Sequence, residues 1–350
     1  MATLGRLLRA RRGYARWDWT DWATYLYLVL GTLLMFGPVM WLVLSSVKTP
    51  AGLNMFPPTL LPWEQTQVTI PGQNGSLPLF TVATGEHAGQ TFAQIRRIGL
   101  QSTMVDPARP HEMIRLPVAD LKPMTHLHAA WGNYADLIGK FSFGTYLWNT
   151  VFITVVATVL TLLVNSMAAF ALSKYRFKGR EPVFMVMLAT LMIPPTIVLV
   201  PNYLIAAVLG LTNNLWGVIW PAVATPTGVF MLRQYMLTLP DDLLEAARMD
   251  NASEWRIYWR IVLPLSAPAL AVLAIFSVMW RWNEFLWPMV VLNRSSSFTL
   301  QLALNSFQGD LETQWNYLLA MTVLTLLPVT IIFLLLQRYI TQGIASAGVK

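Results

Sequence analysis

The residues best suited to binding a partner lie in a polar segment, 240–264, between two long apolar ones. Its small residues, Ala246 and Ala247, let another protein's backbone approach closely, and Glu245 beside them supplies a charge. A polar stretch of this kind has little reason to exist in a protein that only sits in lipid. We expect these residues to form a docking surface: Leu244, Glu245, Ala246, Ala247, Asp250, Asn251, Ile261, Leu263 and Pro264.

Helix-end chemistry predicts that this segment folds as two short helices joined by a bend. Pro240-Asp241-Asp242 places an acidic cap and negative charge at a helix start. Asn251 is the non-glycine residue that best tolerates the left-handed conformation that ends helices. Ser253 can cap a second helix, which we expect to end before Leu263-Pro264, because the residue before a proline disfavours helix.

An interfacial amphipathic helix without a protein partner is the alternative interpretation of this segment. Its acidic residues, Glu245, Asp250 and Glu254, suit an anionic lipid surface poorly. The charge pattern therefore favours a protein partner.

A second polar group, Arg281, Trp282, Asn283 and Glu284, interrupts a later apolar segment. A charge at the centre of a bilayer costs roughly 2.5–3.5 kcal/mol on insertion scales, so a charge that stays there has a function or a partner. These residues are therefore candidates to line a substrate pathway. Arg281 and Glu284 are also three apart on one helical face and can simply pair with each other. Both interpretations stay open.

The histidines offer a weaker chemical signal. In His126-x-His128 both side chains would share one face of a strand and could bind a metal. No third ligand stands at a matching spacing, so we expect surface histidines and predict no metal site and no cofactor. Cysteine is absent, which excludes disulfides and thiolate sites.

Composition indicates that lipid covers much of the chain. Of its 350 residues, 55% are hydrophobic and only 12% are charged, about half the charged share of a soluble protein. The net charge of +7 gathers at the ends of apolar segments and forms no single stripe, which argues against nucleic-acid binding. Segments of about 20 apolar residues span a bilayer. We expect six such helices, at 23–46, 146–172, 183–205, 215–237, 266–291 and 316–337.

Loop charges predict the orientation, because Lys and Arg bias short loops towards the cytoplasm. The segment 1–22 and the loop 174–180 are rich in these residues, so both ends of the chain and the segment 240–264 are expected inside. The segment 50–140 is then external, and its short alternating runs and turn residues predict a small β-rich insertion. The segment 146–337 forms the membrane core, and 338–350 is a cytoplasmic tail.

The spacing in the polar segment resembles a known signature. Permease subunits of bacterial ABC importers typically carry the signature Glu-Ala-Ala-x-x-x-Gly, followed after nine further residues by Ile-x-Leu-Pro. Here Glu245-Ala246-Ala247, Ile261 and Leu263-Pro264 match, and Asn251 replaces the glycine. The carbohydrate (maltose-type) branch is similar at further segments: Tyr175-Arg176-Phe177-Lys178-Gly179-Arg180, Leu232-Arg233-Gln234-Tyr235 and Trp282-Asn283-Glu284-Phe285. The resemblance covers about 20–60 and 130–350, and the block 64–130 is longer than that branch usually has.

The resemblance implies a type I ABC importer permease in a bacterial inner membrane. Such a subunit pairs with a second permease as a heterodimer and docks its motif helix on a separate ATPase dimer. An external solute-binding protein delivers a carbohydrate to the pathway.

The chain itself offers no catalytic motif, and its only trace of a phosphate-binding loop, Gly139-Lys140, continues with Phe141. We therefore predict a non-catalytic subunit. The alternative is a secondary transporter driven by an ion gradient, which predicts repeated halves and ionisable residues in mid-span. No half-to-half similarity is visible, and few charges lie inside the predicted spans, Arg281 and Glu284 among them.

Overall fold

The computed structural model describes residues 19–71, 75–309 and 313–348, with side chains up to Leu334 except that of His111. The basic residues of the predicted tail, Arg6 to Arg16, lie outside the described residues. The chain divides into two compact units, Met1–Ala130 and Trp131–Lys350.

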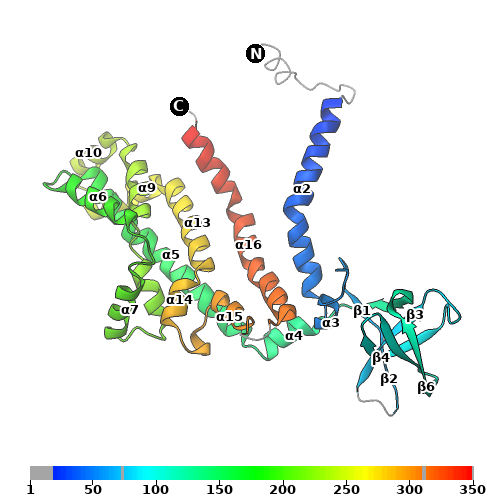
Figure 1. The fold of residues 1–350 in the computed structure, drawn as a ribbon. Helices are drawn as coiled ribbons and strands as arrows, with labels where there is room; N and C mark the ends of the chain where they lie inside the picture. Colours follow the sequence, from blue (N-terminus) through cyan, green and yellow to red (C-terminus); the bar gives the residue numbers. More distant parts are fainter. Residues whose placement is uncertain (1–18, 72–74, 310–312, 349–350) are drawn as a thin grey trace. The chain divides into compact units, whose positions relative to one another are not determined.

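The first unit combines one long helix with a β-rich lobe (Figure 1). Helix α2 (Trp19–Ser46) is apolar and exposed over most of its length, as a helix surrounded by lipid would be, and it includes the predicted span 23–46. After it come α3 (Pro50–Leu53), β1 (Trp63–Gln65), β2 (Gln67–Thr69), β3 (Ser76–Val82), β4 (Thr91–Ile98), β5 (Gln101–Asp106), β6 (Arg109–Pro117), β7 (Leu121–Pro123) and β8 (Thr125–Leu127).

The lobe is an antiparallel meander in the order β2-β3-β4-β5-β6. Strand β7 also pairs with β3, on the edge of β3 opposite β4. Side chains alternate between the two faces of a strand, so the lobe has two small clusters of buried residues. Ile70, Ala93 and Val105 form one, and Phe92 and Met104 belong to the other. The first and last strands, β1 and β8, pair with each other as a separate two-stranded ribbon.

The second unit is helical. Its helices are α4 (Gly132–Gly139), α5 (Phe143–Lys174), α6 (Arg180–Ala189), α7 (Leu199–Val208), α8 (Leu215–Ile219), α9 (Pro226–Leu237), α10 (Asp241–Met249), α11 (Glu254–Ile257), α12 (Leu263–Leu265), α13 (Ala267–Asn283), α14 (Leu286–Val291), α15 (Leu300–Ser306) and α16 (Trp315–Gly348). Short 3₁₀ turns follow α6, α8 and α14, and a π-helical turn, Tyr258–Val262, joins α11 to α12.

Helix α5 is the centre of this unit and packs against α9 and α13. Polar side chains along its buried face bond to these neighbours. Thr158 Oγ1 lies 2.9 Å from Ser277 Oγ on α13, and Asn165 bonds to the backbone N–H and the hydroxyl of Thr225, at the start of α9. Small and polar residues are the usual means of joining helices in lipid, where apolar surface alone provides little driving force.

The length and composition of the described helices differ from the expectation of six continuous spans. Three of the described helices are long and apolar enough to cross a bilayer on their own: α2, α5 and the Trp315–Leu334 part of α16. Two bent pairs raise the number to five: Leu215–Ala222 with Pro226–Leu237, bent by 45°, and Glu254–Leu265 with Ala267–Asn283, bent by 76°.

Prolines explain where the expected spans break. The predicted span 183–205 is divided between α6 and α7, because Pro194-Pro195 follow the 3₁₀ turn and cannot continue a helix. The predicted span 266–291 ends at Asn283, since Pro288 clashes with a helical carbonyl four residues earlier, at Glu284. The predicted tail 338–350 is helical as far as Gly348.

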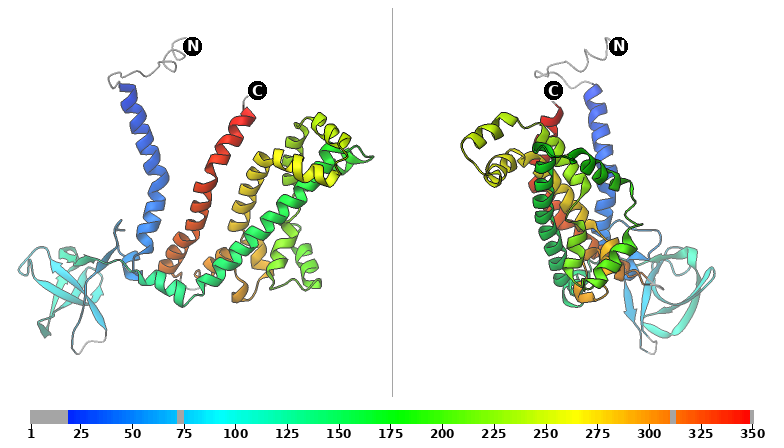
Figure 2. Two further views of the ribbon diagram at one scale, coloured as in Figure 1. Left: turned by 180° about the vertical axis from the view of Figure 1, so that it is seen from behind. Right: turned by 90° about the vertical axis from the view of Figure 1, so that its left-hand side faces the viewer.

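Within the second unit, the elements separate towards two ends (Figures 1 and 2). Helices α6 and α10 lie at the end where α5 finishes, and α7, α14 and α15 lie towards the other. Helix α16 runs from the α15 end towards the α10 end. Two groups of the residues singled out above, those of α10 and those of α13, are therefore held by one helical framework.

Candidate functional site

The bend after α10 forms as its sequence predicts. Asn251 adopts φ +56°. The N–H groups of Asn251 and Ala252 bond to the carbonyls of Arg248 and Ala247, each at 3.0 Å. These two bonds are those of a Schellman motif, in which a left-handed residue satisfies the last carbonyls of a helix. Asparagine thus serves in the place where the signature has glycine.

The flanking helix ends agree with the sequence only in part. Ser253 caps α11 through its hydroxyl, 3.3 Å from the N–H of Arg256, as expected. The start of α10 has no side-chain cap, because the capping position is Pro240, which has no polar side chain, and Asp241 lies inside the helix and pairs with Lys174. The expected helix end before Leu263-Pro264 is wrong. A π turn widens the backbone there, so that helical structure continues past Pro264 to the break at Ser266.

Burial divides the predicted docking residues into two groups. Leu244 is only 3% exposed and packs in a core with Leu232 and Ile257. Ala247, Ile261 and Leu263 are partly buried against the same core. Leu244 therefore anchors the segment and is not free to bind a partner, and the other three are only partly accessible. The remaining ones, Glu245, Ala246, Asp250, Asn251 and Pro264, are exposed.

Exposed apolar side chains complete the outer face of α10, and the sequence analysis missed them. Leu243 is 47% exposed and Met249 84%, while Trp255 on α11 is 58% exposed. The sequence does carry a signal for this face. The i, i+3, i+7 spacing of Leu243, Ala246 and Asp250 places these residues on one side of a helix. We call Leu243, Glu245, Ala246, Met249 and Trp255 the outer face of the α10–α11 segment.

Ion pairs hold α10 and α11 in place. Lys174 Nζ lies 2.6 Å from Asp241 Oδ1 and donates to the carbonyl of Leu239, so the end of α5 is tied to the start of α10. The hydrogen bond from Lys174 keeps the pKa of Asp241 below its ordinary value. Arg248 Nε lies 2.7 Å from Glu254 Oε1 across the bend, which lowers the pKa of Glu254.

A buried arginine fixes the helices beside this segment. Arg233 on α9 donates to the carbonyl of Leu172 at 3.1 Å and to Glu181 Oε1 at 2.9 Å. Its guanidinium also lies 3.9 Å from the ring centre of Phe184. Arg233 thus joins α5, α6 and α9 and satisfies one carbonyl at the end of α5.

The second polar group lies beside two cavities of the membrane core, of about 180 and 490 Å³. Arg281 lines both cavities. Its Nη2 atom donates to Thr161 Oγ1 at 2.7 Å and to the carbonyl of Ala222 at 2.6 Å. Its Nε is buried and has no hydrogen-bond partner among the described residues.

Glu284 lines the smaller cavity, but it forms no ion pair with Arg281 in the described part of the chain. Its carboxylate accepts hydrogen bonds from Trp280 Nε1 at 2.9 Å and from the backbone N–H of Trp287 at 3.2 Å. Structural pairing therefore does not account for these two charges. Asn202, Thr161 and Trp280 also line the cavities.

Two predicted pathway residues line neither cavity. Trp282 is 2% exposed, lies in a core with Leu300 and Met321, and donates its indole N–H to the carbonyl of Thr325 at 3.2 Å. Asn283 is exposed and bonds back to the carbonyl of Met279 at 2.8 Å. In a helix that is apolar on nearly every side, the sequence does not reveal which face turns to the cavity.

Family comparison agrees with this arrangement. Residues 165–346 match the model of the binding-protein-dependent transport system inner membrane component, and the chain belongs to this family. It is therefore a permease subunit of an ABC importer in an inner membrane. Components of this kind are not themselves catalytic. No comparison supports the ion-gradient-driven secondary transporter.

Individual relatives are consistent with this class. The chain is 42% identical over 206 residues to the arabinooligosaccharides transport system permease protein AraQ of Halalkalibacterium halodurans (59% of this chain, 74% of the relative). It is 33% identical over 244 residues to the sn-glycerol-3-phosphate transport system permease protein UgpE of Pectobacterium atrosepticum (67% and 85%). The crystal structure of a bacterial ABC transporter involved in the import of the acidic polysaccharide alginate shares the fold, with a TM-score of 0.65 at 21% identity, over 94% of this chain and 99% of that one.

Proposed function

We propose that this subunit forms half of the translocation pathway for a carbohydrate and is driven by a separate ATPase that binds the outer face of the α10–α11 segment. The carbohydrate class is supported by the relatives, whose names specify arabinooligosaccharides and glycerol phosphate. A second permease subunit completes the pathway as a heterodimer, and a solute-binding protein delivers the substrate from outside.

The membrane arrangement of this proposal has six crossings with both chain ends in the cytoplasm. The broken segment α6–α7 supplies the crossing that neither a long helix nor a bent pair accounts for. The lobe between α2 and α4 is then external, as is the turn that follows α7, while α10 faces the cytoplasm. The separation of α10 from α7 and α14 towards two ends of the helical unit supports this arrangement (Figure 2).

The exposed outer face of the α10–α11 segment is the observation that carries the coupling role. Leu244 and the Schellman turn at Asn251 hold the segment rigidly, so its exposed residues keep a defined shape without a partner. Met249 at 84% exposure would be costly to leave in water. A protein partner that covers it and pairs with Glu245 would remove that cost. Such a rigid segment can pass the movement of an ATPase to the membrane helices, which is how a ligand biases a two-state element.

The cavity at Arg281 supports the pathway role. Arg281 lines both cavities, and a guanidinium donates hydrogen bonds that sugar hydroxyls accept well. Trp280, on the wall of both cavities, offers an aromatic face beside it. These groups suit a polar ligand in an otherwise apolar setting.

Charge reversal at Glu245 tests the coupling role directly. We expect Glu245→Lys to weaken co-purification with the ATPase partner and to abolish substrate-stimulated ATP hydrolysis in the reconstituted complex. Glu86→Lys, an exposed charge reversal in the β-rich lobe, is the matched control and should leave both unchanged. Undiminished, ATPase-independent uptake by the Glu245→Lys complex would overturn the proposal.

A further inference from the structure

The two-stranded ribbon of the first unit brings together three side chains that are far apart in the sequence. In the antiparallel pairing of β1 with β8, Glu64 lies directly opposite His126. His128 follows two residues later, and its N–H bonds to the carbonyl of Pro62 at 2.9 Å, which extends the same pairing. Directly opposed residues and residues two apart share one face of a ribbon. Glu64, His126 and His128 therefore share one face.

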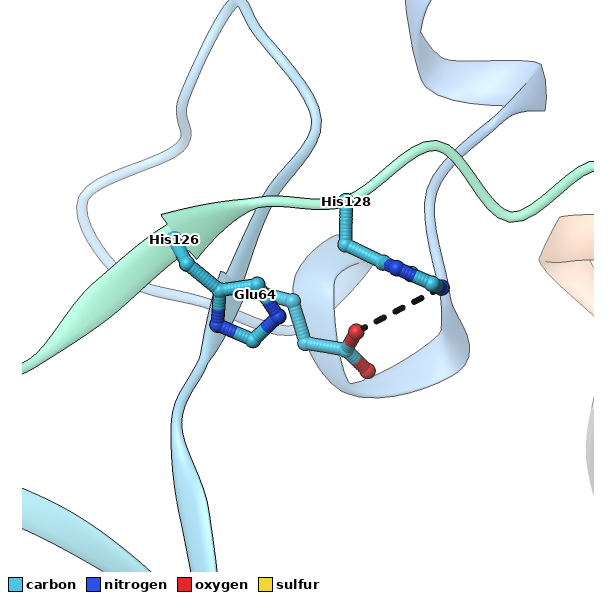
Figure 3. A group of neighbouring side chains, drawn as sticks. All are labelled: Glu64, His126 and His128. Atoms are coloured by element: carbon cyan, nitrogen blue, oxygen red, sulfur yellow. Dashed lines mark ion pairs between the residues drawn. The ribbon is translucent and has the colours of Figure 1, made fainter.

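The distances suit a metal ion (Figure 3). The ligand atoms of the three side chains all lie within 4.8 Å of one another. Glu64 Oε2 is 3.8 Å from His128 Nε2. Thr66 Oγ1 lies 3.1 Å from His126 Nδ1, which orients that ring and leaves Nε2 as its free nitrogen. Hydrogen bonds of this kind to the second nitrogen are typical of metal-binding histidines.

We propose that Glu64, His126 and His128 bind a divalent transition-metal ion of the zinc class. Two imidazole nitrogens and one carboxylate oxygen match the ligands that Zn²⁺ prefers, whereas Mg²⁺ and Ca²⁺ prefer oxygen ligands alone. Metal–ligand bonds are about 2.0–2.2 Å long, so binding draws the three groups closer together. The histidines are exposed and Glu64 is partly exposed, so their side chains can rotate towards a common ion without disturbing a core.

The position of this site defines its structural effect. Strands β1 and β8 are the first and last strands of the lobe, so a metal shared by Glu64 and His128 closes the chain segment that contains every other strand of the lobe. Clips that close long segments reduce the conformational freedom of the unfolded chain. The chain has no cysteine to form a disulfide there. Binding energy at such a site adds to the folding free energy of the lobe.

Metal titration of the full-length protein tests the site. The subunit is purified in detergent with an affinity tag that lacks histidine, and Zn²⁺ binding is measured by calorimetry. We expect one ion per chain. Replacing any one ligand, by Glu64→Gln, His126→Ala or His128→Ala, should weaken binding at least tenfold. Replacing a residue that only hydrogen-bonds to a metal ligand already has an effect of about that size. Matched controls in the same lobe, Glu86→Gln and His87→Ala, should bind as the parent does.

Two further measurements separate binding from misfolding. Co²⁺ substitution should give an absorption spectrum of a nitrogen- and oxygen-ligated site in the parent and in both controls, and not in the variants of the three ligands. Zn²⁺ should also slow hydrogen exchange at the His128 amide in the parent, while Glu64→Gln exchanges equally fast with and without zinc. Stoichiometric, parent-like zinc binding by a protein with all three ligands replaced would overturn the proposal.

Discussion

The α10–α11 segment and the cavity at Arg281 handle charge in opposite ways. In the segment, basic and acidic side chains pair with one another, Lys174 with Asp241 and Arg248 with Glu254. At the cavity, Arg281 and Glu284 are one helical turn apart, and yet each bonds to neutral groups.

The two regions differ in charge pairing because the proposed function requires a fixed shape of the segment and an available charge at the cavity. Surface ion pairs fix the orientation of short helices, and each contributes little to stability. An unpaired charge in a membrane core is costly, and it remains available to a ligand that enters. In the proposed function, the segment keeps a fixed docking shape and the cavity binds and releases the substrate.

The largest effect should come from the anchor of the segment. Leu244→Ala removes a buried side chain, and we expect a loss of about 3 kcal/mol in the free energy of unfolding. Leu243→Ala, at the exposed neighbour, is the matched control. It should keep the free energy of unfolding of the isolated subunit within about 0.5 kcal/mol of the parent while still weakening ATPase binding. Equal midpoints for the two variants would show that the segment is not anchored through Leu244.

The next effect should appear in transport. Arg281→Gln removes a charge-assisted donor worth about 1.5–3 kcal/mol, so uptake in proteoliposomes should fall about 10- to 100-fold. Assembly with the ATPase should be unchanged, because Arg281 lies in the last turn of α13, whereas the core that holds Leu244 includes Ala269 and Leu273 near the start of that helix. Asn283→Ala, two residues away and outside both cavities, serves as the control. Parent-like uptake by Arg281→Gln would remove Arg281 from the pathway.

The bend at Asn251 should show a smaller effect. Alanine in a left-handed conformation costs about 1–2 kcal/mol, whereas glycine adopts it freely. Thermal unfolding should therefore order the proteins as Asn251→Gly at or above the parent, and Asn251→Ala below it. A matched Asp250→Ala variant changes a residue at φ −77° and should have little effect. Equal stability of the alanine and glycine variants at 251 would contradict the observed turn.

The smallest effect concerns the ion pair across the bend. Because Arg248 lowers the pKa of Glu254, the pair stabilises the folded state above the ordinary glutamate pKa of about 4.3. This contribution is lost as the pH falls through the lower folded value. We expect the parent and Glu254→Gln to differ by about 0.5 kcal/mol at pH 7 and to converge as the pH falls below the ordinary glutamate pKa. A constant difference across that range would assign the effect to something other than the ion pair.

The sequence predicts features that depend on a few adjacent residues. The left-handed turn at Asn251 and the cap at Ser253 follow from side-chain chemistry within three or four positions, and both are present. The signature spacing identifies the family, which the family model confirms. Membrane placement and partner contacts remain predictions.

Features that depend on distant contacts are not predictable in this way. Glu64 joins the histidines only through strand pairing across some 60 positions, so spacing along the chain gives no sign of a third ligand. The burial of Trp282 depends on which side of α13 meets α15 and α16. The continuation of helix past Pro264 requires a π turn, which no single residue specifies.

That π turn has a geometric consequence for the rest of the subunit. A π turn contains one residue more than an α turn, and each residue of an α-helix advances the chain by about 100° around its axis. If docking at α10 or α11 displaced this extra residue, the side chains of α12 would swing round by roughly that angle, as far as the break at Ser266. The junction between α12 and α13, bent by 76°, would have to absorb that rotation. Spin labels on α10 and α12, read with and without nucleotide, would register the rotation, and an unchanged separation would exclude it.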